Sequence, residues 1–170
     1  MLASLNLPVA LETRSGEVTL RRAAEDDLDE LMGLLSDDPT SAARGDVAAA
    51  GDRAAYRRAL AEILADPSNE VVVVEDGHGA IVGTMQLTRI PGMARRGATR
   101  LLIEAVRVSS ARRSSGIGTA MMEWAVGPAA ESIAVDLVQM TSDAARGDAH
   151  RFYERLGFAG SHIGFKYRVH

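Results

Sequence analysis

A segment rich in glycine and serine, Arg113-Ser-Ser-Gly-Ile-Gly-Thr119, has the residue types and spacing that suit an anion site. It runs into an amphipathic helical pattern formed by Ile117, Ala120, Met121, Trp124 and Ala125. A loop that opens a helix leaves backbone N–H groups unpaired at the positive end of the helix dipole. The glycines let a phosphate approach the backbone, and Arg113 adds a guanidinium fork, so a pyrophosphate fits better than a lone carboxylate. An ordinary tight connection capped by Ser and Gly is the alternative.

The segment before this loop, Leu101 to Ser109, is rich in branched residues and predicts a mostly buried strand. Glu104 is a carboxylate inside this otherwise apolar strand. Burial raises the pKa of a carboxyl group towards the range in which a general base works, so Glu104 is the candidate base. A partly exposed glutamate at a sheet edge, or one paired with an arginine, is the alternative.

Two motifs resemble those of the GCN5-related N-acetyltransferases, the GNAT superfamily. Val106-x-Val108 followed by Arg113-x-x-Gly116-x-Gly118 is similar to the acetyl-CoA signature of that family. The segment from Ala149 through Tyr153 to Phe158 resembles its late helix and the strand after it. Both motifs occur in the family's order and at its usual separation. The resemblance covers residues from about Val18 to Val169, and the first third matches in pattern rather than in motif.

The resemblance implies direct transfer of an acetyl group from acetyl-CoA to a primary amine. It implies that backbone groups of Val106 and Val108 bind the pantetheine arm, and that the N–H of Val106 polarises the thioester carbonyl. It places Glu104 as the base, often acting through a water, and Tyr153 as the proton donor to the departing thiolate. A core aromatic is the alternative for Tyr153. The predicted cofactor-binding residues are Val106, Arg107, Val108, Arg113, Ser114, Ser115, Gly116, Ile117, Gly118 and Thr119.

The loop before the last helix departs from the family pattern. Where the family commonly has an asparagine that contacts the pantetheine, this chain has Arg146. Asp143 or Asp148 could instead cap the helix, and His150 is expected to be an exposed helix residue. No histidine shows metal-ligand spacing, so no metal is predicted.

Composition limits the classes of function. The length of 170 residues favours one domain, and a net charge of −4 gives no basic footprint for nucleic-acid binding. No cysteine is present, which excludes disulfides, a thiolate zinc site and an acyl-cysteine intermediate. No stretch approaches the roughly 20 apolar residues of a membrane span. The apolar N-terminus lacks a basic start, so we interpret it as a surface or interface extension and expect a cytoplasmic location.

The pattern along the chain alternates strands and helices. Strands are predicted over residues 18–22, 70–74, 80–88, 101–109 and 133–141, with one or two more in 158–169. Helices are predicted over residues 24–35, 52–64, 117–125 and 145–156, with a loop over 36–45. The order predicts an α/β fold that mixes antiparallel and parallel pairing. The resemblance implies a GNAT-like fold: a mixed central sheet of six to seven strands with a splayed parallel pair, flanked by about four helices. Residues 1–16 would form an N-terminal extension and residues 17–170 a single acetyltransferase domain.

The leading functional hypothesis is acetyl-CoA-dependent acetylation of a small-molecule amine, an amino acid or an aminated natural product. Four acids, Asp37, Asp38, Asp46 and Asp52, could attract a cationic acceptor, although a solvated face explains them equally well. A peptide or protein acceptor is the second hypothesis. A non-catalytic acyl-CoA sensor is the third, and it would need neither Glu104 nor Tyr153. A structural dimer with a vestigial cofactor site is the fourth, and a homodimer is compatible with an enzyme as well.

Overall fold

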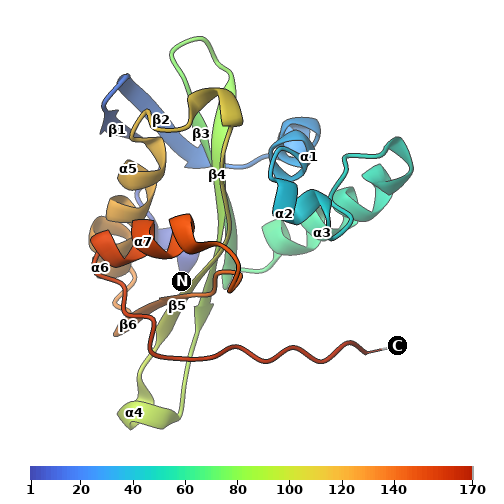
Figure 1. Cartoon of the computed structure of the whole chain (residues 1–170). Coiled ribbons are helices and arrows are strands. Elements are labelled where there is room, and N and C mark those ends of the chain that lie inside the picture. Colours follow the sequence, from blue (N-terminus) through green and yellow to red (C-terminus); the bar gives the residue numbers. More distant parts are fainter. Residues whose placement is uncertain (170) are drawn as a thin grey trace.

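The computed structural model describes residues 1–169, which form one six-stranded sheet in the order β1-β2-β3-β4-β5-β6 (Figure 1). Neighbouring strands are antiparallel except β5 and β6, which are parallel. The strands are β1 (Val9–Thr13), β2 (Gly16–Arg22), β3 (Asn69–Glu75), β4 (Ile81–Ile90), β5 (Arg100–Val108) and β6 (Leu137–Met140). The predicted α/β fold with a mixed sheet and a parallel pair is therefore confirmed.

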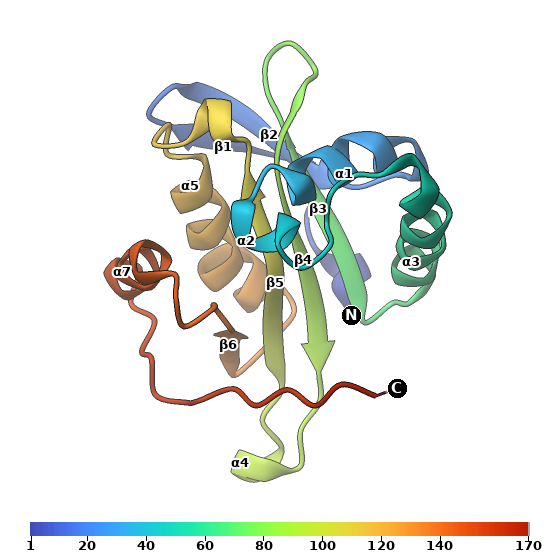
Figure 2. The same cartoon turned by 45° about the vertical axis from the view of Figure 1, so that its right-hand side comes forward.

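Helices cover both faces of the sheet. Those of eight or more residues are α1 (Leu28–Ser36), α3 (Arg53–Ala65), α5 (Ile117–Trp124) and α7 (Gly147–Arg155). Shorter ones are α2 (Pro39–Ala42), α4 (Ala94–Gly97) and α6 (Ala130–Ser132). Figures 1 and 2 show α1 and α3 on one side of the sheet and α5, α6 and α7 on the other.

The valine run of β3 explains why the sheet is covered on both faces. Val72 and Val74 belong to the core cluster that includes Met121 of α5, whereas Val71 and Val73 belong to the cluster that includes Leu28 of α1. Successive side chains of a strand point to opposite faces, so an unbroken valine run supplies both cores. The strand predicted from this run over residues 70–74 is confirmed.

The N-terminal residues take part in the core, which corrects their interpretation as a surface extension. Leu2, Leu5 and Leu11 are buried, and β1 pairs antiparallel with β2. Burial of each of these leucine side chains contributes roughly 1.5–3 kcal/mol of hydrophobic free energy to holding the arm against the sheet.

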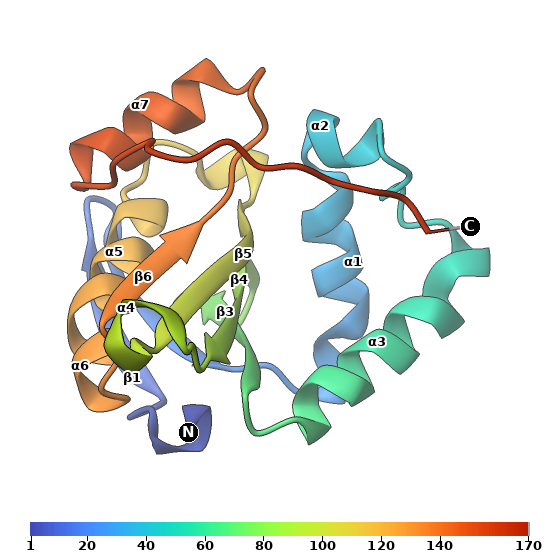
Figure 3. The same cartoon turned by 90° about the horizontal axis from the view of Figure 1, so that it is seen from below.

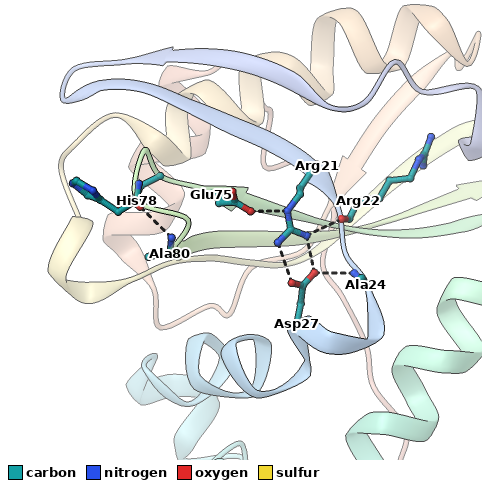
Figure 4. Close-up of polar contacts among 8 residues, drawn as sticks. Arg21, Arg22, Ala24, Asp27, Glu75, His78 and Ala80 are labelled. Carbon is teal, nitrogen blue, oxygen red and sulfur yellow. Dashed lines mark hydrogen bonds and ion pairs between the residues drawn. The ribbon is translucent and has the colours of Figure 1, made fainter.

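A guanidinium joins the first helical turn to the sheet. Arg21 of β2 donates two hydrogen bonds to Asp27, at 2.8 and 3.0 Å, and one to Glu75 of β3 at 2.8 Å (Figure 4). Asp27 also accepts a bond from the backbone N–H of Ala24, which closes the first turn of the helical segment. The hydrogen bond from Arg21 is the largest cause of the lowered pKa of Asp27. This network fixes the position at which α1 leaves the sheet.

Two predicted elements end differently in the structure. The strand predicted over residues 133–141 is only β6, because the backbone turns at Ala134, with φ +49°, before it enters the sheet. The helix predicted over residues 117–125 is α5, and the helical backbone continues beyond it through a π-helical segment, Ala125–Ala129, which contains Pro128, into α6. A proline removes one backbone donor, and the wider π turn accommodates it.

The one or two strands predicted within residues 158–169 do not form. After α7 the chain runs as an extended tail from the side of α7 across towards the side of α3 (Figures 1 and 3). Its alternating apolar residues are almost fully exposed: Ile163, Phe165, Tyr167 and Val169. Alternation favours a strand only where a neighbouring strand completes the ladder, and this tail pairs with none of the described strands.

Candidate active site

A bulge in β5 decides which residues face the helices on each side. In the register with β4, Glu104 lies opposite Gln86 and Arg107 lies opposite Thr84, so Met85 alone faces two residues of β5. Ala105 takes up the extra residue with φ +49°. Because Gln86 and Thr84 share a face of β4, Glu104 and Arg107 share a face of β5. Val106 and Val108 are packed against the opposite core with α5.

The parallel pair separates towards the bulge. β6 pairs only with residues 100–103 of β5, so the residues from Glu104 to Val108 have a strand neighbour in β4 alone. The other edge of this half of β5 carries backbone groups that could pair with an added extended chain. The observed separation places an open strand edge directly before the glycine-rich loop.

The glycine-rich loop presents backbone donors. A 3-10 turn, Ser110–Arg112, is followed by Ser114 and Gly116, with φ +64° and +93°, and Gly116 is the N-cap of α5. In this loop and the first turn of α5, the N–H groups of Ser114, Gly116, Ile117, Gly118 and Thr119 have no hydrogen bond to any of residues 1–169. Consecutive unpaired N–H groups at a helix N-terminus form a concave anion site.

The two arginines of this loop have partners in the protein. Arg112 forms an ion pair with Asp76 at 3.2 Å, and Arg113 donates to the carbonyl of Asp37 at 3.3 Å. The Asp37 carboxylate accepts a bond from the N–H of Ser110 at 2.5 Å, which ties the end of α1 to the loop. Arg113 reaches a single carbonyl oxygen, so its other donors are available to an incoming phosphate.

Tyr153 is partly buried on α7 among aromatic neighbours. Its ring makes edge contacts with Phe152 and Phe158, at centroid distances of 5.1 and 6.0 Å. Burial raises the pKa of Tyr153 above its ordinary value, and the charges of Arg146 and Arg107 oppose that rise. Among the described residues, none forms a hydrogen bond with the phenol oxygen. A core tyrosine would use that hydroxyl on a backbone partner, so the free phenol favours a role with a ligand.

Glu104 is exposed, so the expected burial of this carboxylate is wrong. Its side chain lies on the face of β5 that it shares with Arg107, opposite the core that holds Val106 and Val108. Glu104 forms no ion pair with any arginine in the described part of the chain. The carboxylate is therefore accessible to a ligand or to a water at the open edge of β5.

A charged cluster that the sequence patterns did not predict lies beside Tyr153. Arg107 donates to the buried hydroxyl of Ser41 in α2, and Asp38, the N-cap of α2, forms an ion pair with Arg146 at 3.4 Å. The expected loop over residues 36–45 thus contains a helical turn that contacts β5 and the start of α7. Asp38 followed by Pro39 is a capping signal that could have indicated this turn.

Internal bonds satisfy most of the early acids. Asp37 and Asp38 are bonded as described above, and Asp46 accepts a hydrogen bond from the hydroxyl of Tyr56 at 2.6 Å. Only Asp52 of the four acids has no side-chain hydrogen bond within residues 1–169. Hydrogen bonds from neutral donors leave the charges of Asp37 and Asp46 in place, whereas Asp38 is paired with the cation Arg146.

The loop before α7 is ordered by His150 and Asp143. The His150 ring bonds the carbonyl of Asp143 at 2.8 Å, so this histidine is partly buried rather than exposed. Asp143 pairs with Arg44 and also accepts a bond from the N–H of Ala145, and Asp148 pairs with Arg151. Neither aspartate caps α7, since Arg146 is its N-cap without a side-chain bond.

Metal ligands and membrane spans were sought among residues 1–169. No group of three or more His, Asp or Glu side chains is arranged to hold a metal ion there. In the same residues, no helix combines the length and the apolar character needed to cross a bilayer.

Comparison with known proteins places residues 28–158 within the model of the acetyltransferase (GNAT) family. A transcriptional regulator from Bacillus halodurans C-125 is 39% identical, with 89% of this chain and 99% of that chain aligned at a TM-score of 0.84. A presumed acetyltransferase from Agrobacterium tumefaciens str. C58 is 27% identical, with 88% and 99% aligned at 0.72. Glucosamine-6-phosphate N-acetyltransferase from Arabidopsis thaliana is 19% identical, with 90% of this chain and 99% of that chain aligned at a TM-score of 0.70. At this identity the comparison shows likeness of fold alone. No curated protein matches the chain.

Proposed function

The chain belongs to the GNAT acetyltransferase family, and we propose that it transfers an acetyl group directly from acetyl-CoA to the primary amine of a small molecule. The observation that carries this proposal is the row of unpaired N–H groups from Gly116 to Thr119 at the end of the open half of β5. It combines a pyrophosphate site with a strand edge for the pantetheine arm. Acetyl-CoA is the donor substrate in this proposal, and no metal takes part.

The donor would be held by backbone groups more than by side chains. Val106 and Val108 offer backbone groups to the pantetheine, and the loop from Arg113 to Thr119 offers N–H groups to the pyrophosphate. The side chain of Arg107 faces away from both valines, so only its backbone is proposed to contact the donor. The N–H of Val106 is proposed to stabilise the oxyanion that forms on the thioester carbonyl.

Two side chains would manage the protons. Glu104 accepts the proton that the ammonium group loses before attack, directly or through a water, and its exposure suits this role. As the new N–C bond forms and the C–S bond breaks, Tyr153 donates its phenol proton to the departing thiolate. Burial supports this role, because a raised pKa keeps the phenol protonated throughout the neutral range.

A thiol-release assay with a panel of amines tests the proposal. We expect acetyl-CoA to raise the melting temperature of the protein, since a ligand that binds only the native state stabilises it. We also expect at least one amine to release CoA. A peptide panel run in parallel tests the protein-acceptor alternative, and a longer acyl-CoA tests the choice of acyl group. Donor binding without release from any amine or peptide would favour the sensor, and the absence of any thermal shift would overturn the donor site.

DNA binding is not part of the proposal, although the Bacillus halodurans protein is described as a transcriptional regulator. Proteins that bind nucleic acid usually carry a basic surface, and this chain has a net charge of −4. A cytoplasmic location remains a prediction.

We also propose a homodimer in which the tail of one copy pairs with the free edge of β6 in the other. Exposed alternating apolar residues on the tail and an unpaired edge on β6 support this pairing. Pairing would satisfy the backbone hydrogen-bonding groups of both the β6 edge and the tail, and it would cover the apolar side chains of the tail.

A further inference from the structure

One face of β5 carries both a carboxylate, that of Glu104, and a guanidinium, that of Arg107. Glu104 and Arg107 share a face there, although three residues apart in a regular strand they would face opposite sides. Their partners on β4, Gln86 and Thr84, are two residues apart, which separates the two backbone positions by about 7 Å. A carboxylate and a guanidinium at that separation face the same space in front of the sheet.

Arg107 is a cation without an anionic partner in the described part of the chain. Its guanidinium donates to the carbonyl of Val106 at 2.8 Å and to the hydroxyl of Ser41, and its buried Nε has no hydrogen-bond partner. A guanidinium has five N–H donors, so these two neutral acceptors leave some of its donors without a hydrogen bond. Removing a charge from water without a counter-charge costs free energy, which a bound anion would recover.

A second guanidinium stands beside the first. Arg146 occupies the N-cap of α7, two helical turns before Tyr153, and reaches Asp38 of the same turn that holds Ser41. Burial raises the pKa of the Tyr153 phenol, and the charges of both arginines oppose that rise. Asp38 forms an ion pair with Arg146 and none with Arg107, and Asp46 accepts a hydrogen bond from the neutral hydroxyl of Tyr56. Among the described residues, no carboxylate is therefore in direct contact with the Arg107 guanidinium.

We propose that Arg107, assisted by Arg146, binds the carboxylate of an acceptor whose primary amine lies at Glu104, so that the substrate class is an amino acid or a similarly short amino carboxylic acid. This inference rests on the proposed acetyl transfer to a small amine. A guanidinium fork matches a carboxylate, and the amine of a zwitterion then falls towards the opposite charge. The short backbone spacing along β5 favours acceptors in which the amine and the carboxylate lie close together.

Matched acceptors test the carboxylate contact. The experiment compares kcat/KM for α-amino acids and for their carboxamides, which differ in the acidic group alone. We expect the wild type to favour the acids, and Arg107→Met to lower kcat/KM for the acids by about 10- to 100-fold while changing the carboxamides little. Arg107→Lys keeps the charge and should recover part of the loss. Arg89→Met is the control, because the Nε of Arg89 is also buried without a hydrogen-bond partner. Arg89 lies on β4, five residues from Thr84, which is opposite Arg107.

Binding gives a readout that does not need turnover. N-acetylated amino acids and their carboxamides are titrated against the wild type and Arg107→Met, and the melting temperature is recorded. We expect a thermal shift from the acid alone, which is lost in Arg107→Met. Acetyl-CoA should shift all variants equally.

The outcomes separate the subsite from the proposed function. Acetyl transfer with equal rates on acids and amides, or an equal loss on both in Arg107→Met, overturns the carboxylate subsite and leaves the transfer intact. The second of these results would instead mean that Arg107 acts through Tyr153. Carboxylate binding that depends on Arg107, without thiol release from any amine, supports the subsite and overturns the transfer.

Discussion

The backbone nitrogen of Arg14, in the turn between β1 and β2, lies 3.0 Å from the position that a Cβ on Gly116 would occupy. Gly116 also has φ +93°, a conformation that side chains rarely adopt. The N-terminal hairpin therefore packs directly on the residue that caps α5, and the loop that presents the N–H groups is held from behind by residues that precede the matched region.

Gly116→Ala should destabilise the protein by about 1–3 kcal/mol and weaken acetyl-CoA binding, because both the left-handed backbone and the contact with Arg14 oppose a methyl group. Denaturant unfolding and a thermal-shift titration measure the two effects. Gly118→Ala is the matched control for stability alone, since its Cβ would meet only side-chain atoms at 3.6 and 3.7 Å. Equal losses of stability in the two variants would show that neither the backbone conformation of Gly116 nor its contact with Arg14 matters.

Tyr153→Phe should lower kcat by about 10²-fold with little change in stability or in the affinity for acetyl-CoA. The ring packing is kept, and no described residue bonds the hydroxyl, so only the proton is lost. Tyr56→Phe is the contrasting variant: its hydroxyl bonds Asp46, so it should lose about 1 kcal/mol of stability and keep its activity. A stability loss in Tyr153→Phe with normal turnover would support the core-aromatic alternative.

The pKa of Tyr153 sets the alkaline limit of this role. Burial raises that pKa in the folded state, so the phenol is protonated at least up to pH about 10. The folded state holds this proton more tightly than the unfolded state, and the associated stability is present below pH about 10 and is lost above it. If kcat of the wild type already declined with rising pH before pH 9, and kcat of Tyr153→Phe did not, the result would be inconsistent with this assignment.

Glu104→Gln should lower kcat/KM by about 10²-fold at neutral pH, where the acceptor is an ammonium ion. The deficit should shrink as the pH rises through the pKa of the acceptor amine, because the free amine no longer needs a base. Rate profiles from pH 6 to 10 measure it, with Glu62→Gln on the exposed side of α3 as the control. A deficit that stays constant with pH would mean that Glu104 positions the acceptor rather than removing its proton.

Sequence patterns predicted the elements whose signal is local. The valine run gave β3, and the order of strands and helices gave the mixed sheet with its parallel pair. The exposure of Glu104 could not be predicted, since it depends on which elements cover that face of β5 in the folded chain. The shared face of Glu104 and Arg107 depends on the bulge at Ala105, and alanine carries no signal for a positive φ. The contact of Arg107 with Ser41 joins residues 66 apart, which periodicity does not detect.

Asp27→Asn should cost about 2 kcal/mol at pH 7, because it removes charge-assisted bonds from Arg21 in a largely buried position. The hydrogen bond from Arg21 is the largest cause that lowers the pKa of Asp27 below its unfolded value of 3.8. The stability it contributes is therefore complete above pH about 4 and is lost as the pH falls through the folded pKa. Urea unfolding at pH 7 and at pH 3 should show a smaller difference between variant and wild type in acid. Glu25→Gln, in the same turn, should be neutral at both.

Removing residues 161–170 should convert a dimer into a monomer, if the tail pairs with β6 of a second copy. Light scattering behind a sizing column measures the mass at several concentrations. The double substitution Phe165→Ser with Tyr167→Ser should act like the truncation, because both side chains are almost fully exposed in the single chain and would be covered in the pair.

The tail supplies its own control. Lys166→Ser with Arg168→Ser alters the alternate residues, which point to the other face of an added strand, and should leave the dimer intact. Because the chain has no cysteine, Gln139→Cys in one tagged copy and Lys166→Cys in another can be mixed and oxidised. A disulfide between the differently tagged copies would support pairing of the tail of one copy with β6 of the other. A full-length protein that is monomeric at all concentrations would contradict the homodimer.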